Sequence, residues 1–241
     1  MLNSIMQNKA LTLFTVLFMP VLLCLGFWQL DRAEDKRQLM LKAQASDTML
    51  VVESADQLES LPEFQHVQLA GNYLPNYMWY VDNQIWRGKV GVDVIALLQI
   101  GQKLVLVNRG WHIWRDRSNL PEISGPSGQV TLEGHLIKPS EKGILLAEDI
   151  ILSDNYPQLL QKVNMQMLQQ YLPLPLLPRV LHLDINSQTA LQPHWQPVNI
   201  TPEKHYGYAL QWFGLSLTLC TLFLFRIYKH YKSSPKVAGG E

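Results

Sequence analysis

The stretch from Thr201 to Tyr231, TPEKHYGYALQWFGLSLTLCTLFLFRIYKHY, decides how the rest of the chain must be arranged. No charged residue occurs between Tyr208 and Phe225, and the 20 residues 208–227 would form a helix about 30 Å long, which matches the hydrocarbon core of a bilayer. Aromatic residues typical of membrane–water interfaces flank this run: Tyr206, Tyr208, Trp212, Tyr228 and Tyr231. A buried helix of a soluble core is the alternative, but such helices are usually shorter and rarely carry aromatic belts at both ends. We therefore predict a transmembrane helix over residues 208–227.

A second uncharged run, LTLFTVLFMPVLLCLGFWQL, occupies residues 11–30. It has the length of a membrane span, and Pro20 would kink such a helix without preventing it from spanning. A cleavable signal peptide is the alternative, but its apolar region is normally about 7–15 residues and is followed closely by a small-x-small cleavage site. The one such site here, Ala43-Gln44-Ala45, lies well beyond the apolar run. We therefore favour a retained transmembrane anchor over residues 11–30.

Basic residues after the second apolar run set the predicted orientation. They are Arg226, Lys229, Lys232 and Lys236. Such residues predominate on the cytoplasmic side, and two spans place both ends of the chain on one side. We therefore expect cytoplasmic segments at 1–10 and 228–241 and a periplasmic domain at 31–207. No Arg/Ser-rich presequence precedes the first run, which favours the inner (plasma) membrane of a bacterium over a mitochondrial membrane.

The composition argues against several classes of protein. The 241 residues carry 20 basic and 20 acidic side chains, so the formal net charge is zero, and no basic arm or patch suggests nucleic acid as a partner. The two cysteines, Cys24 and Cys220, both lie in apolar runs, and neither CxxC nor CxxCH occurs. A disulfide framework, a thioredoxin-like protein, a thiol-based copper chaperone and a covalently attached haem are therefore not expected.

The section between the two apolar runs changes to the two-residue period of β-strands. Strands are predicted at 64–69, 77–81, 90–100, 103–107, 130–137 and 176–185. The Gly101-Gln102 pair indicates a hairpin, and residues 156–171 show the spacing of an amphipathic helix. We expect a membrane protein of the α+β class, in which two terminal transmembrane helices flank an antiparallel β-rich domain with one or two helices. Closure of the sheet into a small barrel is an open alternative.

Five motifs follow one another along nearly the whole chain. They are Gly26-Phe27-Trp28-Gln29-Leu30-x-Arg32, Val67-x-Leu69-x-Gly71-x-Tyr73, Asn108-Arg109-Gly110-Trp111, Val130-x-Leu132-x-Gly134 and His205-x-x-Tyr208-Ala209-Leu210-Gln211-Trp212-Phe213. In this order, and with an apolar run at each end, the chain resembles the Surfeit-locus-one family, membrane proteins that assist the assembly of haem–copper cytochrome oxidases. The resemblance implies a factor that helps to insert haem a into the catalytic subunit of the oxidase. That subunit and haem a synthase are the implied partners, together with the lipid bilayer.

The resemblance also implies a ligand for the haem. Bacterial members of the family are reported to bind haem a, and the histidine of the HxxYA element, which is His205 here, is the expected axial ligand. Neutral imidazole commonly ligates haem iron, and a position just outside the aromatic belt would let propionates face water while the farnesyl tail lies in lipid. The alternative is an interfacial histidine that hydrogen-bonds only to headgroups or water.

Two residues of the NRGW motif are further candidates. Arg109 is expected in a loop after a strand, where its guanidinium could pair with a haem propionate or with an acidic partner surface. An ordinary structural ion pair is the alternative for this side chain. Trp111, like Trp114, is expected to anchor the packing of the domain rather than to stack on haem.

The ends of the two predicted spans carry the remaining candidates. Trp28, Gln29 and Arg32 end the first span at the membrane face of His205, so the two helix ends could adjoin. Gln29 and Gln211 could hydrogen-bond between the helices, because an amide in that region needs a partner. The aromatic residues expected at the interface are Tyr208 and Trp212.

Nothing else in the sequence supports catalysis, or a metal site other than the haem iron. Five other histidines are scattered over strands and loops without ligand spacing: His66, His112, His135, His182 and His194. We expect a non-enzymatic assembly factor for haem–copper cytochrome c oxidase that assists haem a insertion. The alternatives are a haem-independent membrane scaffold that clamps an oxidase subunit or assembly intermediate, and an unrelated anchored envelope protein such as a sensor.

Overall fold

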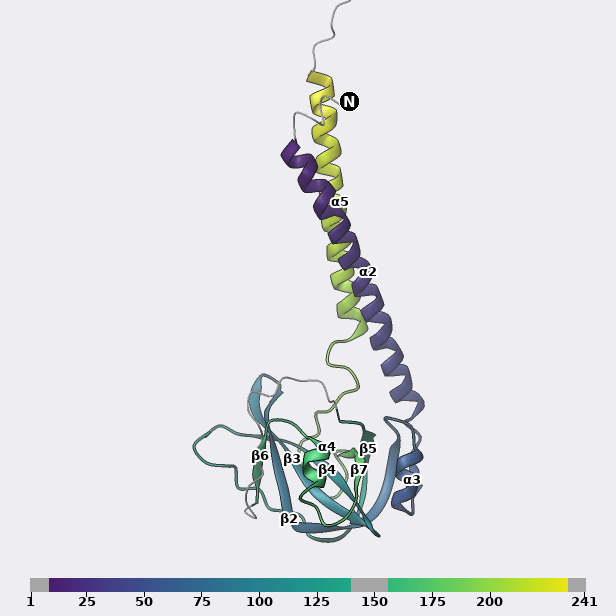
Figure 1. Cartoon of the computed structure of the whole chain (residues 1–241), viewed down its shortest axis with the longest axis vertical. Coiled ribbons are helices and arrows are strands. Elements are labelled where there is room, and N and C mark those ends of the chain that lie inside the picture. The colour runs from purple at the N-terminus through teal and green to yellow at the C-terminus, as the bar shows by residue number, and fades with distance from the viewer. Residues whose placement is uncertain (1–8, 140–155, 234–241) are drawn as a thin grey trace, which may run out of the picture. The chain divides into compact units, whose positions relative to one another are not determined.

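The structure, a computed structural model, describes residues 9–139 and 156–233, and the chain divides into two units (Figure 1). One unit is helical and combines the residues up to Met40 with those from Val198 onward. The other unit is rich in β-sheet and runs from Leu41 to Pro197.

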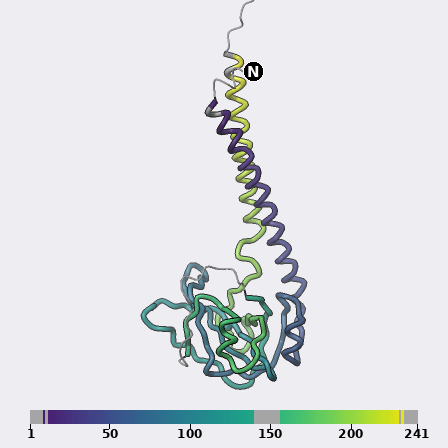
Figure 2. Tube along the Cα trace, viewed as in Figure 1, coloured from purple at the N-terminus to yellow at the C-terminus, as the bar shows by residue number. Residues whose placement is uncertain are grey.

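The described part of the helical unit consists of two long helices, α2 (Lys9–Ala45), whose last residues already belong to the sheet-rich unit, and α5 (Pro202–Ser233), the purple and yellow coils of Figure 2. By length and composition each of them could cross a membrane. The spans predicted at 11–30 and 208–227 lie inside these helices, and α2 continues through Pro20. Both helices therefore extend beyond the apolar runs that the sequence marks.

Charge pairs stabilise α2 beyond its apolar run. Arg32 and Asp35 approach to 3.1 Å, and Arg37 and Glu34 to 2.8 Å, each pair three residues apart on the exposed helix surface. Oppositely charged side chains at this spacing favour the helical conformation, weakly where they are exposed. The helix therefore does not stop where the apolar run ends.

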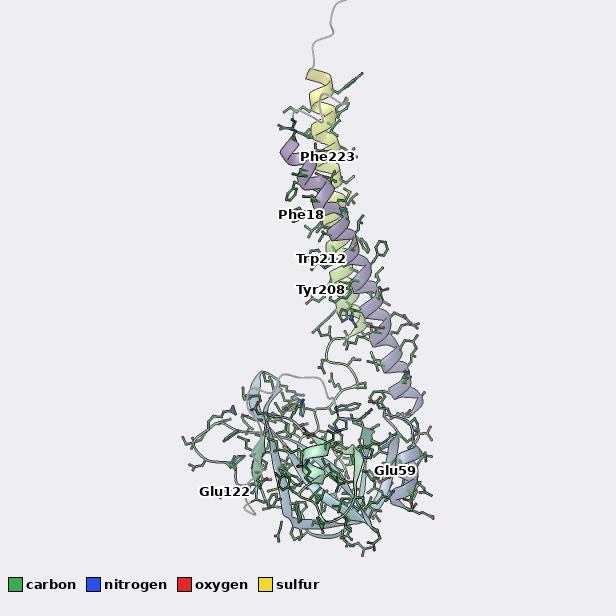
Figure 3. The ribbon with its side chains drawn as sticks, viewed as in Figure 1. Phe18, Glu59, Glu122, Tyr208, Trp212 and Phe223 are labelled. Atoms are coloured by element: carbon green, nitrogen blue, oxygen red, sulfur yellow. The ribbon has the colours of Figure 1, made fainter. Side chains whose placement is uncertain are left out.

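The surfaces of both helices carry large exposed apolar side chains. Phe18 on α2 is 48% exposed, and Leu217 and Phe225 on α5 are 69% and 63% exposed (Figure 3 labels Phe18). A soluble protein rarely leaves so many such groups in water, whereas lipid tails would cover them. The exposed surfaces are thus compatible with a membrane protein.

The predicted sidedness stays a prediction. The segments expected in the cytoplasm are residues 1–10 and 228–241. Much of both segments, including Lys236, lies outside the described residues. The assignment of residues 31–207 to the periplasm depends on those segments and is not tested by the fold.

The sheet-rich unit contains seven strands and two short helices in its described part. In chain order they are β1 (Leu50–Val52), α3 (Ala55–Ser60), β2 (His66–Trp86), β3 (Lys89–Ile100), β4 (Lys103–Ile113), β5 (Gly128–Ile137), β6 (Gln158–Leu160), α4 (Met165–Gln169) and β7 (Leu176–Leu183). The strand order is β1-β2-β3-β4-β7-β5, with β6 paired to β2. All six predicted strands correspond to parts of these elements.

The strand pairings form a closed circuit. β5 pairs with β7 on one side and with β2 on the other, so the path β2-β3-β4-β7-β5 returns to β2. β2 can pair with both β3 and β5 because it is 21 residues long and contains irregularities between Tyr73 and Met78 and between Val81 and Gln84. The expectation of an antiparallel sheet needs correction, since β1–β2, β2–β6 and β4–β7 are parallel pairs. The sheet is mixed.

The hairpin predicted at Gly101-Gln102 is present between β3 and β4. Ile100 pairs with Lys103, and Gly101 adopts a positive φ of 59°. Glycine has no Cβ and adopts this conformation at low cost, which is why a two-residue turn forms here.

The helix predicted at 156–171 is wrong. The segment instead forms β6, a short link and α4, whose first turn is capped by the Asn164 side chain, which accepts a hydrogen bond of 3.1 Å from the Met167 backbone N–H. Leu160 from the strand and Leu168 from the helix both enter the core. Apolar residues at helical spacing are therefore buried by two different elements.

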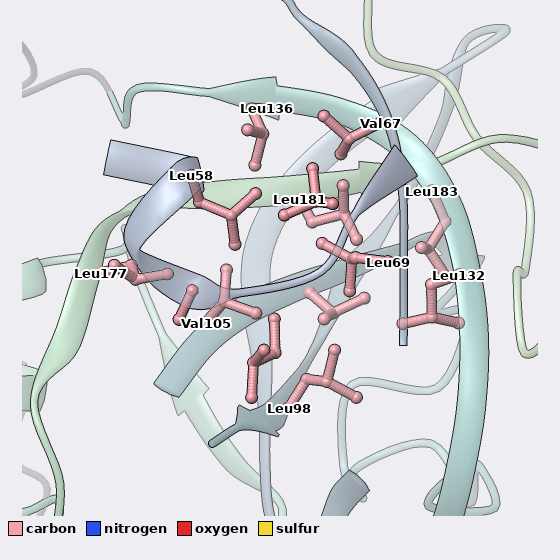
Figure 4. Packing of buried hydrophobic residues seen from close by; sticks show 14 of the residues in the cluster. Leu58, Val67, Leu69, Leu98, Val105, Leu132, Leu136, Leu177, Leu181 and Leu183 are labelled. Carbon is pink, nitrogen blue, oxygen red and sulfur yellow. The ribbon is translucent and has the colours of Figure 1, made fainter. Parts of the chain in front are cut away.

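The main core of the sheet-rich unit lies between α3 and the inner faces of the strands (Figure 4). Leu58 of α3 is fully buried against strand residues, among them Leu98, Leu136 and Leu181. Each buried leucine contributes on the order of 2 kcal/mol through the hydrophobic effect. This packing fixes the strands whose polar residues are described below.

Candidate functional site at the helix pair

A buried polar pair joins the two helices of the helical unit. Gln29 on α2 and His205 in the first turn of α5 are 9% and 8% exposed, on helices whose surfaces are otherwise largely apolar and exposed. The Nδ1 atom of His205 lies 2.7 Å from Oε1 of Gln29. Because an amide oxygen only accepts, Nδ1 carries the proton and donates this hydrogen bond.

The other ring nitrogen of His205 is left with an unused lone pair. Nε2 is buried and has no hydrogen-bond partner among the described residues. A buried polar atom without a partner costs roughly 1–3 kcal/mol, so its persistence calls for an explanation. Neutral imidazole with a free nitrogen is a common metal ligand, and the donor on its second nitrogen is what usually fixes the tautomer.

Small residues let the helices approach each other around this pair. Ala33 and Ala209, each four residues beyond Gln29 or His205, are almost completely buried. A Cβ atom added to Gly26 would lie only 2.5 Å from Cε1 of Phe213. Residues without bulky side chains favour close helix packing in membranes. The short contact between histidine and glutamine depends on this spacing.

Other predicted residues of the helix ends lie on exposed surfaces. The guanidinium of Arg32 stacks over the Trp28 ring at 5.7 Å, and both side chains are exposed. Gln29 forms the hydrogen bond expected between the helices, with His205 as its partner, whereas Gln211 is exposed on α5. Physically, the rotation of α5 decides which of its polar residues faces α2.

The aromatic residues of the HxxYALQWF motif lie one helical turn apart on α5 (Figure 3). Tyr208 is 46% exposed and Trp212 is half-buried. Both are more exposed than Ala209 and His205 of the same helix, which are buried. Their exposure agrees with the character of side chains that occupy a membrane interface.

Arg109 lies inside β4, within the sheet-rich unit, and not in the loop that the sequence suggested. Its Nε donates to the Thr189 carbonyl at 2.9 Å and its Nη1 donates to the Ser124 carbonyl at 3.0 Å. The side chain is buried, and this burial lowers the pKa of the guanidinium. A haem propionate or an acidic partner would have to displace those backbone carbonyls.

Trp111 is buried in the same strand. Its Nε1 donates to the Gln84 carbonyl at 3.0 Å, and its ring lies beside that of Trp86. The ring also approaches Gly91, where a Cβ atom would come within 2.6 Å of the indole. Both residues of the NRGW motif thus tie parts of the sheet-rich unit together.

Two histidines that seemed unrelated in the sequence come together. His66 and His135 are directly opposite one another on β2 and β5, and Asp47 and Asp184 surround them. Their separation in sequence hid this arrangement, because only the register of two distant strands brings them together. No sequence signal short of that register could have revealed the cluster.

Comparisons with known proteins place the chain in a family. The model of the SURF1 family matches residues 16–217. A SURF1-like protein from Rickettsia felis (strain ATCC VR-1525 / URRWXCal2) is 27% identical over 226 residues, which cover 88% of this chain and 94% of that protein. A SURF1-like protein from Rickettsia bellii (strain RML369-C) is 26% identical over 243 residues, covering 95% and 93% respectively. The chain belongs to the SURF1 family, which is broadly known as a family of oxidase assembly factors.

Proposed function

We propose that this protein assists the insertion of haem a into the catalytic subunit of a cytochrome oxidase, and that His205 is an axial ligand of the haem during transfer. One observation carries the proposal: Nε2 of His205 is a buried nitrogen without a hydrogen-bond partner in the described chain, while Nδ1 is held by Gln29. Haem a is the cargo in this proposal, and the protein acts as an assembly factor rather than as an enzyme.

The chemistry of the pair suits a haem ligand. In the neutral imidazole, the hydrogen bond from Nδ1 to Gln29 keeps the proton on that nitrogen and leaves the lone pair of Nε2 for iron. Gln29 also limits rotation of the ring and orients its free nitrogen. When bound, iron would supply the missing partner of Nε2 and remove the cost of leaving that atom unpaired.

The location of the pair suits an amphiphilic cargo. Glu203 and Lys204 immediately before His205 are exposed and charged, whereas the helix after Tyr208 is apolar. A haem at this boundary would keep its propionates near the polar side and its farnesyl tail near the apolar side. Passage to a second membrane protein would then need no transfer through water.

Loading requires a local change, because Nε2 is buried in this structure. Either the His205 ring rotates or the ends of α2 and α5 separate. Both movements break or lengthen the contact with Gln29, which is a single hydrogen bond worth about 1 kcal/mol net. Opening of this pair to admit a haem would therefore cost little.

The proposal includes a membrane arrangement. α2 and α5 cross the inner membrane of a bacterium, both termini are cytoplasmic, and the sheet-rich unit is periplasmic. The basic residues that follow the second apolar run, Arg226 and Lys229 among them, support this orientation. A reporter fused near residue 120 should be active in the periplasm, and activity in the cytoplasm would contradict the arrangement. The catalytic subunit of the oxidase and haem a synthase are the proposed partners.

The central experiment compares haem content. The protein is purified from cells that make haem a, and its visible spectrum is recorded for the wild type and for His205→Gln. His112→Gln serves as the matched control, because His112 is a half-buried histidine of β4. The His205 variant should lose most of its haem a, and the control should retain it. Equal haem contents in all three proteins would eliminate His205 as an essential ligand.

The burial of Nε2 also favours a second function, a haem-independent scaffold that clamps an oxidase subunit or assembly intermediate. In that case the histidine–glutamine bond serves only to join α2 to α5. The scaffold predicts that the protein co-purifies with the oxidase subunit from a strain unable to make haem a. Loss of this association in that strain would favour the haem-carrying function.

A further inference from the structure

Three histidines lie in one row across the sheet-rich unit. His66 of β2 is opposite His135 of β5, and His135 is in turn opposite His182 of β7. Directly paired residues of neighbouring strands project to the same face of a sheet. The rings of His66 and His135 stack with centroids 4.6 Å apart and planes 7° apart.

Asp184 holds the first two of these rings. It follows His182 by two residues and lies immediately after the end of β7. His66 Nε2 donates to Oδ2 of Asp184 at 2.7 Å, and His135 Nδ1 donates to Oδ1 at 3.2 Å. One carboxylate therefore orients both imidazoles and leaves the second nitrogen of each facing Asp47.

The second ring nitrogen of each histidine approaches Asp47. His135 Nε2 lies 3.5 Å from Oδ1 of Asp47, and His66 Nδ1 lies 3.3 Å from its backbone oxygen. These contacts are longer than the 2.7 Å and 3.2 Å contacts with Asp184, so Asp47 is the more weakly held of the two carboxylates. The ligand atoms of Asp47, His66 and His135 all lie within 4.8 Å of one another.

We propose that Asp47, His66 and His135 bind a divalent transition-metal ion of the zinc and copper class, with Asp184 as the residue that positions both imidazoles. Two imidazoles and one carboxylate are a ligand set that such ions accept, and water would complete the coordination. Ligand atoms about 2.0–2.1 Å from a tetrahedral ion are roughly 3.3 Å apart, close to the gap between Asp47 and His135.

The surroundings of the cluster support an ion of charge two. Asp47 and Asp184 bring two carboxylates to the cluster. The side chain of Asp47 is 74% exposed, while those of His66 and His135 are 19% and 24% exposed. The ion would therefore enter from the side of Asp47, whose carboxylate is free to swing.

A covering ring closes another side of the cluster. Trp195 stacks on His135 at 6.4 Å and contacts His182 at 5.7 Å and Phe64 at 5.7 Å. An apolar cover limits access of water and strengthens ion–ligand interactions. The two stacked rings must tilt apart at their Asp47 edge when the ion binds, because parallel rings do not aim both lone pairs at one point.

A metal titration tests the proposal. The full chain is purified in detergent, freed of any histidine tag and of metal, and titrated with Zn²⁺ at about pH 7.5, above the ordinary pKa of histidine. We expect one Zn²⁺ per chain, no comparable binding of Mg²⁺, and loss of the site in His66→Gln/His135→Gln. Asp184→Asn should weaken binding about 10–100-fold, because it removes the orienting carboxylate but no ligand. His112→Gln and His205→Gln are the controls and should bind like the wild type.

Unchanged Zn²⁺ binding in the double variant would overturn the proposal, as would the absence of saturable binding by the wild type. If the double variant does not fold, the test is made on the wild type instead. The NMR signals of its histidine ring nitrogens are then followed as Zn²⁺ is added. Shifts at His66 Nδ1 and His135 Nε2 would support the site, and shifts confined to other histidines would overturn it. This outcome is independent of haem binding, since the His205→Gln control keeps the zinc site.

Discussion

The Nδ1 atom of His205 and the Oε1 atom of Gln29 lie 2.7 Å apart, although 176 positions separate the two residues in the chain. The bond joins the first turn of α5 to the middle of α2 and is almost completely buried. It determines which nitrogen of the histidine is available for a ligand. The function proposed for His205 therefore depends on a residue of the other helix.

Replacement of Gln29 by leucine should reduce haem a retention about 10–100-fold, because the orienting partner of the ligand is lost while His205 itself remains. Gln29→Glu keeps an acceptor for Nδ1 and should retain haem. It should also lower the reduction potential of the bound haem, since a carboxylate makes the imidazole a stronger donor. Haem content and potential are measured on purified protein by visible spectroscopy and redox titration.

Gln211→Leu provides the matched control for this change. Gln211 is an exposed glutamine of α5, so its replacement should leave haem retention unchanged. If Gln29→Leu and Gln211→Leu retain haem equally well, Gln29 does not position the ligand.

Much of the helical unit could be predicted from the sequence. Long uncharged runs have few alternative structures, and α2 and α5 contain both predicted spans. The partner of Gln29 could not be predicted, because His205 and Gln211 both lie near the start of α5 and only the rotation of that helix distinguishes them. The resemblance made His205 a candidate ligand through its motif, and the structure adds that its Nε2 atom is buried without a hydrogen-bond partner among the described residues.

In the sheet-rich unit, too, features set by neighbouring residues were predictable from the sequence, and features set by distant strands were not. The turn at Gly101 is local and was predictable from two residues, whereas the pairing of His66 with His135 depends on the register of β2 and β5. Arg109 illustrates the same limit, since its burial results from carbonyl groups supplied by distant loops. The apolar spacing at 156–171 gave a wrong prediction of one helix. The apolar residues are buried by a strand, β6, and a short helix, α4, which together produce the same spacing.

Replacement of Gly26 by leucine should push the helices apart. The first atom of the new side chain would lie 2.5–2.9 Å from three carbon atoms of the Phe213 ring, and overpacking of this kind costs about 1–3 kcal/mol. Spin labels on the two native cysteines, Cys24 of α2 and Cys220 of α5, allow the separation to be measured by double electron–electron resonance. The distance distribution should broaden or shift to longer values.

Two further variants make this test specific. Phe213→Ala added to Gly26→Leu should restore the wild-type distribution, since it removes the ring that clashes. Gly214→Leu is the control, because no atom lies within 4 Å of its added Cβ. An unchanged distribution in Gly26→Leu alone would show that close packing at this glycine does not hold the helices together.

Gly110→Ala should destabilise the sheet-rich unit by about 3 kcal/mol or more. Gly110 has φ of 115°, and an added Cβ would lie 2.6 Å from the backbone oxygen of Gln192, which cannot move independently of its strand partner Trp111. Gly101→Ala is the control, since its φ is also positive but nothing lies within 4 Å, and it should cost about 1–2 kcal/mol. Thermal unfolding followed by tryptophan fluorescence measures both, and equal losses of stability would contradict the role of the backbone contact.

The buried imidazole of His182 should make the sheet-rich unit less stable in acid. Burial lowers its pKa from 6.5 to about 4, while the carboxylate of Asp93 opposes this shift and His194 and His135 reinforce it. Since the unfolded chain binds a proton below about pH 6.5 and the folded chain does not until about pH 4, stability falls as the pH drops through this window. The loss between about pH 7 and pH 5 should be about 2 kcal/mol. His182→Gln cannot titrate and should lose correspondingly less stability over the same range, as measured by thermal unfolding with a metal chelator present. Identical pH profiles for the two proteins would show that His182 does not remain neutral in the folded state.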